Sequence, residues 1–349
     1  MHKTGLLTFL VVAAVAAAVF TSPVQGGERV VHLYTWSDYF DSEVIHQFET
    51  ANNCRVAIDY FDSNEAMYAK LKAGGGGYDL ITPSSYMSAV MRKQGMLLPL
   101  DRAKIPNLGN MDANFLKFTE DPGMEYSVPY TRTVTGIGYN RKKVDKADLG
   151  DWNIFASAKY SKRMTMLNDM REALGAALKH LGYSLNTVDE KELAEAGDVL
   201  VRWKRQLAKF DVDEAKIGLA SGEFFAIQGY NGDVALVMEE NPDIDFYTPK
   251  EGSSVASDDF VILADSPQVD LAHAFISHML DPEVAALNME SIRYYMPNPQ
   301  AVAMLDDELK DNHAFNVEDA LLERCEVIRD LGADNSKYVK VWDRVKAEE

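Results

Sequence analysis

Residues that build metal and redox sites are scarce in this sequence. The 349 residues include two cysteines, Cys54 and Cys325, and no close group of cysteines and histidines has the spacing of metal ligands. We therefore expect neither a metal nor a cofactor. The two cysteines lie far apart in the sequence, so a disulfide in an oxidising compartment and two separate buried thiols both remain open.

Nucleotide-binding loops are also lacking. The four consecutive glycines at 74–77 are followed by Tyr78 and Asp79, whereas a phosphate loop continues with Lys-Ser or Lys-Thr and opens a helix. Gly136 and Gly138 lack the third glycine and the following helix of a dinucleotide fingerprint. Both groups of glycines are predicted to serve loops and packing.

Apolar runs long enough to cross a bilayer are missing as well. An apolar run from Leu6 to Phe20 follows Lys3, and it is shorter than the roughly 20 residues that a spanning helix needs. Ser22 and small residues come after it, which is typical of a secretory signal peptide. We predict this signal peptide over residues 1–26 and expect the mature chain outside the cytoplasm.

Acidic residues outnumber basic ones. The sequence has 54 aspartates and glutamates against 35 lysines and arginines, and its formal net charge is −19. A negative protein is repelled by nucleic acid and by anionic membrane surfaces, and it attracts cations. The charge therefore favours a cationic ligand and indicates no nucleic-acid partner.

Short strand-like runs alternate with amphipathic helical runs from Arg29 onward. The predicted strands cover 30–35, 56–61, 78–82, 134–139 and 164–167. The predicted helices begin near 42, 63 and 171 and cover 189–210, 271–280, 318–329 and 336–345. Single helices between strands imply right-handed crossovers and a mainly parallel sheet. The length is sufficient for two such α/β domains.

Aromatic and acidic residues follow several of the predicted strands. They occur at 36–39, 83–86, 168–172, 230–233 and 258–259. Ligands of open α/β sheets bind at the carboxyl ends of the strands. Carboxylates accept charge-assisted hydrogen bonds from ammonium groups, and aromatic faces attract cations. This pattern indicates a site for an alkyl ammonium ion.

Several longer motifs carry a family resemblance. They include YTWSDY at 34–39, DSNE at 62–65, VPY at 128–130, TGIGYN at 135–140 and DPEV at 281–284. In these runs, and in their order over nearly the whole mature chain, the sequence resembles the periplasmic spermidine- and putrescine-binding proteins of ABC transporters.

The resemblance implies the type II periplasmic binding protein fold, with two α/β lobes joined by a hinge. We expect residues 27–133 and 263–349 in the N-terminal lobe and residues 134–262 in the C-terminal lobe. A polyamine would be enclosed between the lobes and delivered, without chemical change, to the permease subunits of an ABC transporter. A carrier that docks on a permease is expected to be a monomer.

The resemblance also implies a set of ligand-binding residues. These are Trp36, Ser37, Asp38, Tyr39, Ser84, Ser85, Tyr86, Asp169, Arg171, Glu172, Tyr230, Asp233, Asp258 and Tyr294. The carboxylates of Asp169, Glu172, Asp233 and Asp258 are predicted to bind ammonium groups. The aromatic residues are predicted to enclose the methylene chain.

Two departures from the family pattern keep a second interpretation open. Ala256 stands where the family has a large aromatic residue, and Arg132 replaces a tryptophan. The same fold could therefore bind another cationic or amino-acid-like solute. An exported hydrolase with a pair of catalytic carboxylates and a sensor that signals its ligand-bound state are the alternatives from other classes.

Overall fold

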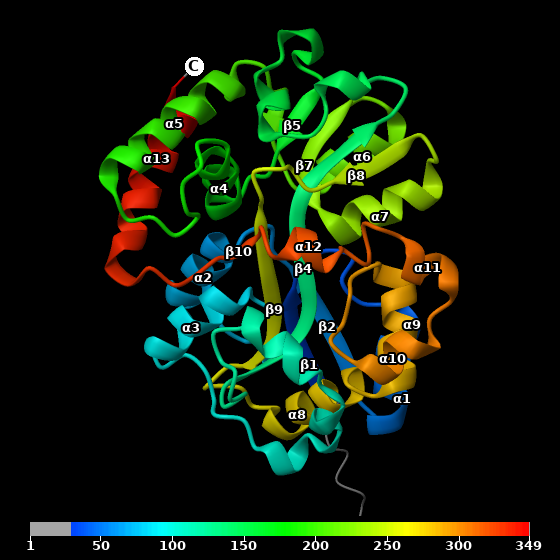
Figure 1. Cartoon of the computed structure of the whole chain (residues 1–349). Coiled ribbons are helices and arrows are strands. Elements are labelled where there is room, and N and C mark those ends of the chain that lie inside the picture. The colour runs from blue at the N-terminus through cyan, green and yellow to red at the C-terminus, as the bar shows by residue number, and fades with distance from the viewer. Residues whose placement is uncertain (1–28, 349) are drawn as a thin grey trace, which may run out of the picture.

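The computed structural model describes residues 29–348, which form two α/β lobes, one above the other in Figure 1. The signal peptide predicted for residues 1–26 lies outside the described residues. Within 29–348, no helix combines the length and the apolar character needed to cross a membrane.

The first lobe contains a mixed sheet. Its strands are β1 (Val30–Thr35), β2 (Arg55–Tyr60), β3 (Leu80–Ile81), β9 (Ser254–Ile262), the short β10 (Glu326–Val327) and the first half of β4 (Ser127–Asn140). Strands β2, β1 and β3 are parallel, as the alternating pattern predicts, whereas β9 runs antiparallel to both β3 and β4.

Helices cover both faces of this sheet. They are α1 (Ser42–Asn52), α2 (Asn64–Lys72), α3 (Ser85–Lys93), α8 (Val269–Met279), α9 (Pro282–Ile292), α10 (Pro299–Met304), α11 (Asp307–Asp311) and α12 (Asp319–Leu322). One core packs α1, α8 and α9 on the sheet, with the rings of Phe48 and Phe275 5.0 Å apart. A separate core packs α2 and α3 on the other face through Met67 and Met91. Burial of each such side chain contributes about 1.5–3 kcal/mol.

The second lobe has its own sheet and cores. Its strands are β5 (Met164–Met166), β6 (Lys209–Phe210), β7 (Ala226–Tyr230), β8 (Ile244–Tyr247) and the second half of β4. Its helices are α4 (Met170–His180), α5 (Glu190–Lys204), α6 (Asp213–Ser221), α7 (Asn231–Glu240) and α13 (Asn335–Ala347). Helices α4, α5 and α13 share one core, and α6 and α7 share another.

A single long strand, β4, belongs to both lobes. It pairs with β9 up to Val134, which faces Val255, and with β7 from Thr135 onward, which faces Tyr230. Figure 1 shows β4 running from the lower lobe into the upper one. The lobes are therefore connected by continuous strand structure at the level where the partner changes.

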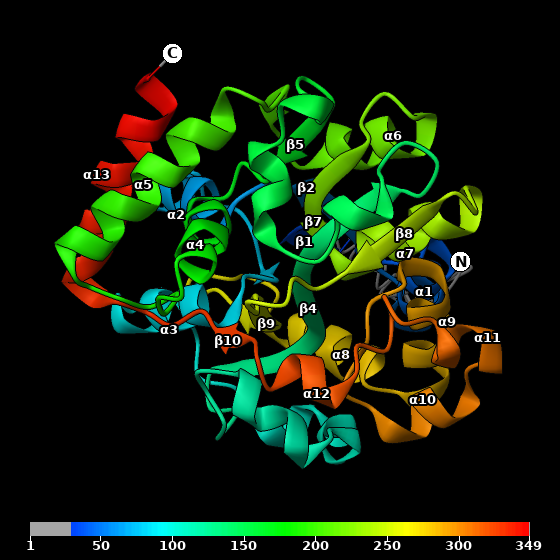
Figure 2. The same ribbon diagram turned by 45° about the horizontal axis from the view of Figure 1, so that its top comes forward.

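The lobe boundaries that we expected are wrong for two segments. Residues 254–262 were expected in the C-terminal lobe, but β9 pairs with β3 and β4 in the first sheet. Helix α13 was expected in the N-terminal lobe, but it packs on α4 and α5, beside α5 in both Figure 1 and Figure 2. Apolar patterning predicts that a segment is buried, but it does not say against which sheet.

Individual elements agree with the sequence where local signals are strong. The predicted strand at 30–35 is confirmed, and Ser63 caps α2 as expected. Asp41 rather than Ser42 caps α1, because the Asp41 carboxylate accepts the amide hydrogens of the first turn. The predicted helices over 189–210 and 318–329 are both too long: α5 ends at Lys204, and only Asp319–Leu322 of the second is helical.

Strand β4 requires glycine at position 136. A methyl group on Gly136 would lie 2.3 Å from the Phe246 ring and 2.7 Å from the carbonyl oxygen of Tyr247 on β8. We predict that Gly136→Ala lowers the free energy of unfolding by about 1–3 kcal/mol through overpacking, measured by urea denaturation. Gly109→Ala is the control, because nothing lies within 4 Å of a methyl group there. Equal midpoints for the two variants would contradict this account of β4.

Candidate ligand-binding cavity between the lobes

A cavity lies where the two lobes meet, and its volume is about 610 Å³ when the open solvent at its mouth is included. Side chains from both lobes form its wall: Trp36, Ser37, Tyr39, Phe61, Asn64, Ser84, Tyr86, Thr133, Asp169, Glu172, Val212, Asp213, Tyr230, Asp233, Ala256, Asp258, Tyr294 and Ile328. Trp36 follows directly on β1, Ser84 precedes α3, and Tyr230 ends β7. The cavity therefore lies at the strand ends, where an α/β sheet presents its loops.

Asp258 on β9 is the central carboxylate of this cavity. It accepts hydrogen bonds from the Tyr39 hydroxyl at 2.5 Å and from the Ser84 hydroxyl at 2.7 Å. Burial raises the pKa of Asp258 to about 6, although both hydrogen bonds favour its charged form. Since both partners are neutral hydroxyls, neither of them compensates the charge of the carboxylate.

A second group of carboxylates, here called the Asp169 cluster, consists of Glu65, Asp169 and Glu172. Asp169 caps α4 and accepts the amide hydrogens of Arg171 at 2.9 Å and Glu172 at 3.0 Å. The Glu172 carboxylate accepts the hydroxyl of Ser254 at 2.6 Å. Burial, followed by repulsion from Asp169, raises the pKa of both Glu65 and Glu172 to about 7. Attraction to Arg171 lowers the pKa of these carboxylates but does not outweigh their burial, so a further cation would stabilise their charged forms.

A third acidic group, here called the Asp233 group, comprises Asp38, Asp213 and Asp233. Unlike the other two, it contains a cation, because Lys216 Nζ lies 2.7 Å from Asp38 Oδ2 and 3.7 Å from Asp233 Oδ1. The Ser37 hydroxyl donates to Asp213 at 2.6 Å. The contacts of Asp38 and Ser37 join the loop after β1 in the first lobe to α6 in the second, and Lys216 on α6 also contacts Asp233 on α7.

Aromatic rings separate these acidic groups. The Trp36 indole donates to the carbonyl of Thr82 at 2.9 Å, which fixes the ring, and its centroid lies 6.4 Å from that of Tyr230. The rings of Tyr39 and Tyr294 meet edge to face at 5.2 Å. Such rings offer apolar faces to methylene groups and a negative π surface to cations.

The structure brings together all of the sequence-predicted site residues except three. Asp38 has a left-handed backbone (φ 52°) and turns its carboxylate to Lys216 outside the cavity. The Ser85 hydroxyl instead accepts the amide hydrogen of Glu120 at 2.6 Å. Arg171 lies behind the wall residue Tyr86, with its guanidinium carbon 5.6 Å from the centroid of that ring, and donates to Asn186 Oδ1 at 3.0 Å. Each of the three was predicted from its neighbours in sequence, which do not determine the direction of a side chain.

Other wall residues were not predicted from the sequence. They are Phe61, Asn64, Thr133, Val212, Asp213, Ala256 and Ile328. Asn64 could have been predicted from the sequence, since it lies in the 62–65 motif. Its side-chain Nδ2 donates to the Ser84 hydroxyl, and its Oδ1 accepts the backbone amide hydrogen of Ser84. The small side chain of Ala256 leaves space in the wall. Arg132, expected as a cation near the cleft, instead stacks 4.5 Å from the centroid of the Tyr295 ring and is not part of the wall.

The two cysteines and the acidic side chains form no further site. Cys54 and Cys325 are both free thiols. Among residues 29–348, no group of three or more histidine, cysteine, aspartate or glutamate side chains has an arrangement that could hold a metal ion.

Comparison with known proteins shows which family the chain matches. The model of the bacterial extracellular solute-binding protein family matches residues 43–317. The chain is 32% identical to the spermidine/putrescine-binding periplasmic protein of Escherichia coli, over 96% of this chain and 97% of that protein. It is 31% identical to the putrescine/cadaverine-binding protein of Pseudomonas aeruginosa, over 99% of each. The solved TpPotD lipoprotein of Treponema pallidum superposes with a TM-score of 0.81 at 34% identity, covering 90% of this chain and 99% of that one.

The raised pKa of Glu172 makes stability depend on pH in a defined direction. Between about pH 4.5 and 7 the folded protein holds a proton on Glu172 that the unfolded chain has lost, so the free energy of unfolding falls as pH rises through this window. We predict that Glu172→Gln makes the ligand-free protein more stable than wild type at pH 8, by on the order of 2 kcal/mol. At pH 4.5 the two should be nearly equal.

Urea denaturation at both pH values tests this prediction. Glu323→Gln, which changes an exposed glutamate, is the control and should match wild type at both. A Glu172→Gln protein with the wild-type midpoint at pH 8 would contradict the account of a strained buried carboxylate.

Proposed function

The chain belongs to the bacterial extracellular solute-binding proteins, and we propose that it binds a polyamine, putrescine or spermidine, in the cavity between its lobes. It then delivers the polyamine to the permease of an ABC transporter. The observation that carries the proposal is the Asp258 carboxylate, which is buried in an aromatic-walled cavity with neutral hydroxyls as partners.

A polyamine satisfies the chemistry of this cavity at Asp258 and at the Asp169 cluster, which Arg171 compensates only in part. One ammonium group pairs with Asp258 and another with the Asp169 cluster, while the Trp36, Tyr39 and Tyr230 rings cover the methylene groups between them. Two charge-assisted contacts contribute about 3–6 kcal/mol and four buried methylenes about 3 kcal/mol. Association costs at least about 4 kcal/mol, so cation–π contacts with the rings are needed to reach micromolar affinity, which is about 8 kcal/mol.

The positions of the arginines support a purely cationic ligand over an amino-acid-like one. A ligand carboxylate would need a free guanidinium group in the wall. Arg171 donates instead to Leu185, Asn186 and Arg329, and Arg132 stacks on Tyr295. Neither arginine is part of the cavity wall.

The remaining parts of the proposal concern location, oligomeric state and chemistry. In this proposal the signal peptide at residues 1–26 exports the chain to the periplasm, where it works as a monomer and releases its ligand unchanged, as a carrier and not as an enzyme. The periplasmic relative from Escherichia coli supports this location.

Isothermal titration of the mature protein, stripped of ligand by unfolding and refolding, tests the proposal. We expect one-to-one binding of putrescine or spermidine at micromolar or lower Kd and no competition by lysine or arginine. Binding of a basic amino acid without binding of any polyamine would refute it. Turnover of the bound ligand would show an enzyme instead.

Asp258→Asn tests the residue that carries the proposal. Losing the charge of the central carboxylate should weaken polyamine binding by at least about tenfold, because a charge-assisted contact becomes a neutral one. Asp307→Asn is the matched control: it makes the same change of net charge at a side chain that is 95% exposed. Both proteins should keep wild-type circular dichroism, and near-native affinity in Asp258→Asn would remove Asp258 from the site.

A further inference from the structure

Lys216 places a fixed ammonium group beside the cavity. Its side chain is only 14% exposed, and Nζ lies 2.7 Å from Asp38 Oδ2 and 3.7 Å from Asp233 Oδ1. Burial lowers the pKa of Lys216, but attraction to Asp233 and Asp38 outweighs it, and the net effect is a raised pKa. Lys216 therefore stays charged, and the chain itself provides the cation for the Asp233 group.

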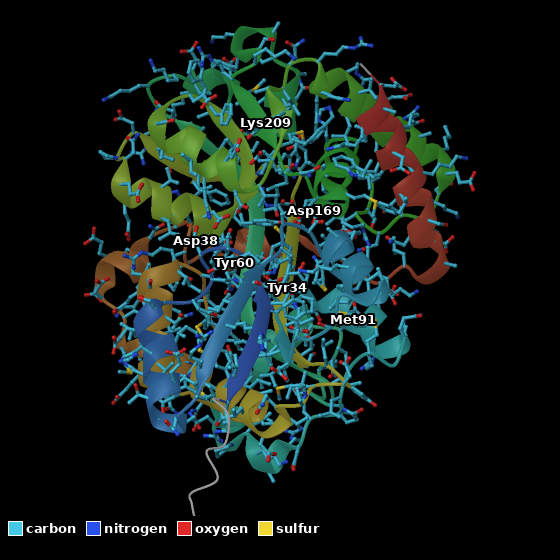
Figure 3. All side chains as sticks on the ribbon, turned by 180° about the vertical axis from the view of Figure 1, so that it is seen from behind. Tyr34, Asp38, Tyr60, Met91, Asp169 and Lys209 are labelled. Atoms are coloured by element: carbon cyan, nitrogen blue, oxygen red, sulfur yellow. The ribbon has the colours of Figure 1, made fainter. Side chains whose placement is uncertain are left out.

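The Asp233 group stands at one end of the row of acidic groups. Asp233 forms part of the cavity wall and also of a neighbouring surface hollow, whose wall includes Lys216 and Asp38. Burial, followed by repulsion from Asp233 and Asp258, raises the pKa of Tyr294, and burial followed by repulsion from Asp169, Glu172 and Asp258 raises the pKa of Tyr230. Asp258 therefore lies near one tyrosine that it shares with Asp233 and near another that it shares with the Asp169 cluster. Figure 3 shows Asp38 and Asp169 on opposite sides of the central strands.

The three acidic groups therefore differ in whether their carboxylates already have a charged partner. Asp258 has neutral hydroxyl partners, and the Asp169 cluster is strained by mutual repulsion. The Asp233 group alone is already paired with an ammonium group. An ammonium group of a ligand gains a charge-assisted contact at the first two, whereas at the third it meets a like charge.

We propose that Lys216 is a specificity-determining residue, which neutralises the Asp233 group and so restricts the cavity to ligands with two ammonium groups rather than three. This inference rests on the polyamine-binding function proposed above. A diamine such as putrescine pairs with Asp258 and the Asp169 cluster and leaves Lys216 undisturbed. A triamine such as spermidine brings its third ammonium group toward Lys216 and gains no further contact.

A different role for the same residue predicts a different result. The Lys216 contacts to Asp38 and the Ser37 contact to Asp213 both join the two lobes. If Lys216 served only as a latch for the closed form, its removal would weaken binding of every ligand by the same factor. Selectivity between a diamine and a triamine therefore separates the two roles.

Titration of putrescine and spermidine into wild type, Lys216→Met and Lys209→Met tests the proposal. Lys209→Met is the matched control, because Lys209 also pairs with carboxylates on the same lobe, but its partners Asp211 and Glu214 are not part of the cavity wall, whereas Asp233, a partner of Lys216, is. In Lys216→Met the affinity for spermidine relative to putrescine should rise at least about tenfold, the value of one recovered charge-assisted contact. Lys209→Met should leave the ratio unchanged. An unchanged ratio in Lys216→Met, with both affinities reduced equally, would overturn the proposal in favour of a latch.

Wild-type protein alone provides a second test that does not depend on the folding of a variant. Putrescine should bind wild type at least as tightly as spermidine, in spite of the extra charge of spermidine and the acidic cavity. Tighter binding of spermidine than of putrescine would contradict the proposal. If wild type binds neither ligand, the polyamine-binding function itself fails, before any substitution is made, and this inference fails with it.

Discussion

The structure depends on a buried carboxylate for which the wall of the cavity provides no cation. Taking a charged group out of water costs several kcal/mol, and two hydroxyl partners return only part of that cost to Asp258. The cavity exists because residues from both lobes close over this group: Tyr39 from the first, Asp169 and Tyr230 from the second. An ammonium group of a ligand would give Asp258 the cationic partner that the polypeptide does not provide. The ligand-free site has a higher free energy than a site with a paired carboxylate, and binding of the ammonium group would lower it.

Much of the fold could be predicted from the sequence, because local patterns determine the elements. Alternation and capping were sufficient for β1 and for the start of α2 at Ser63. The membership of β9 and α13 in a particular lobe could not be predicted in this way. Strand β9 finds its partners β3 and β4 far away in the sequence, and α13 packs on helices more than a hundred residues earlier. Such pairings depend on the whole set of available apolar faces, which no local window contains.

In the candidate site too, local sequence predicts some residues, whereas others depend on tertiary packing. Residues that follow a strand, such as Trp36 and Tyr230, could be placed at the sheet edge from their position alone. The directions of Asp38 and Arg171 could not be predicted, since one depends on a left-handed turn and the other on acceptors at Asn186 and Arg329. No pattern in the sequence indicated that Lys216 lies near the site. Lys216 lies on the short helix α6, where a lysine is ordinarily a solvated residue, and only tertiary packing brings it to Asp38.

The geometry of β4 and β9 links the charge of the site to the movement of the lobes. Thr131 on β4 faces Asp258 on β9, and the Tyr39 hydroxyl is hydrogen-bonded to both. Three residues further along, after Val134, β4 leaves β9 and joins the second sheet. Because the strand is continuous there, a rotation of one lobe against the other would twist β4 close to Asp258, as well as moving the segments between β8 and β9 and between β10 and α13. Opening the lobes would let water reach this carboxylate, whereas a bound cation removes the need for that water. In the function proposed above, ligand charge and lobe closure would therefore favour each other through the same pair of strands.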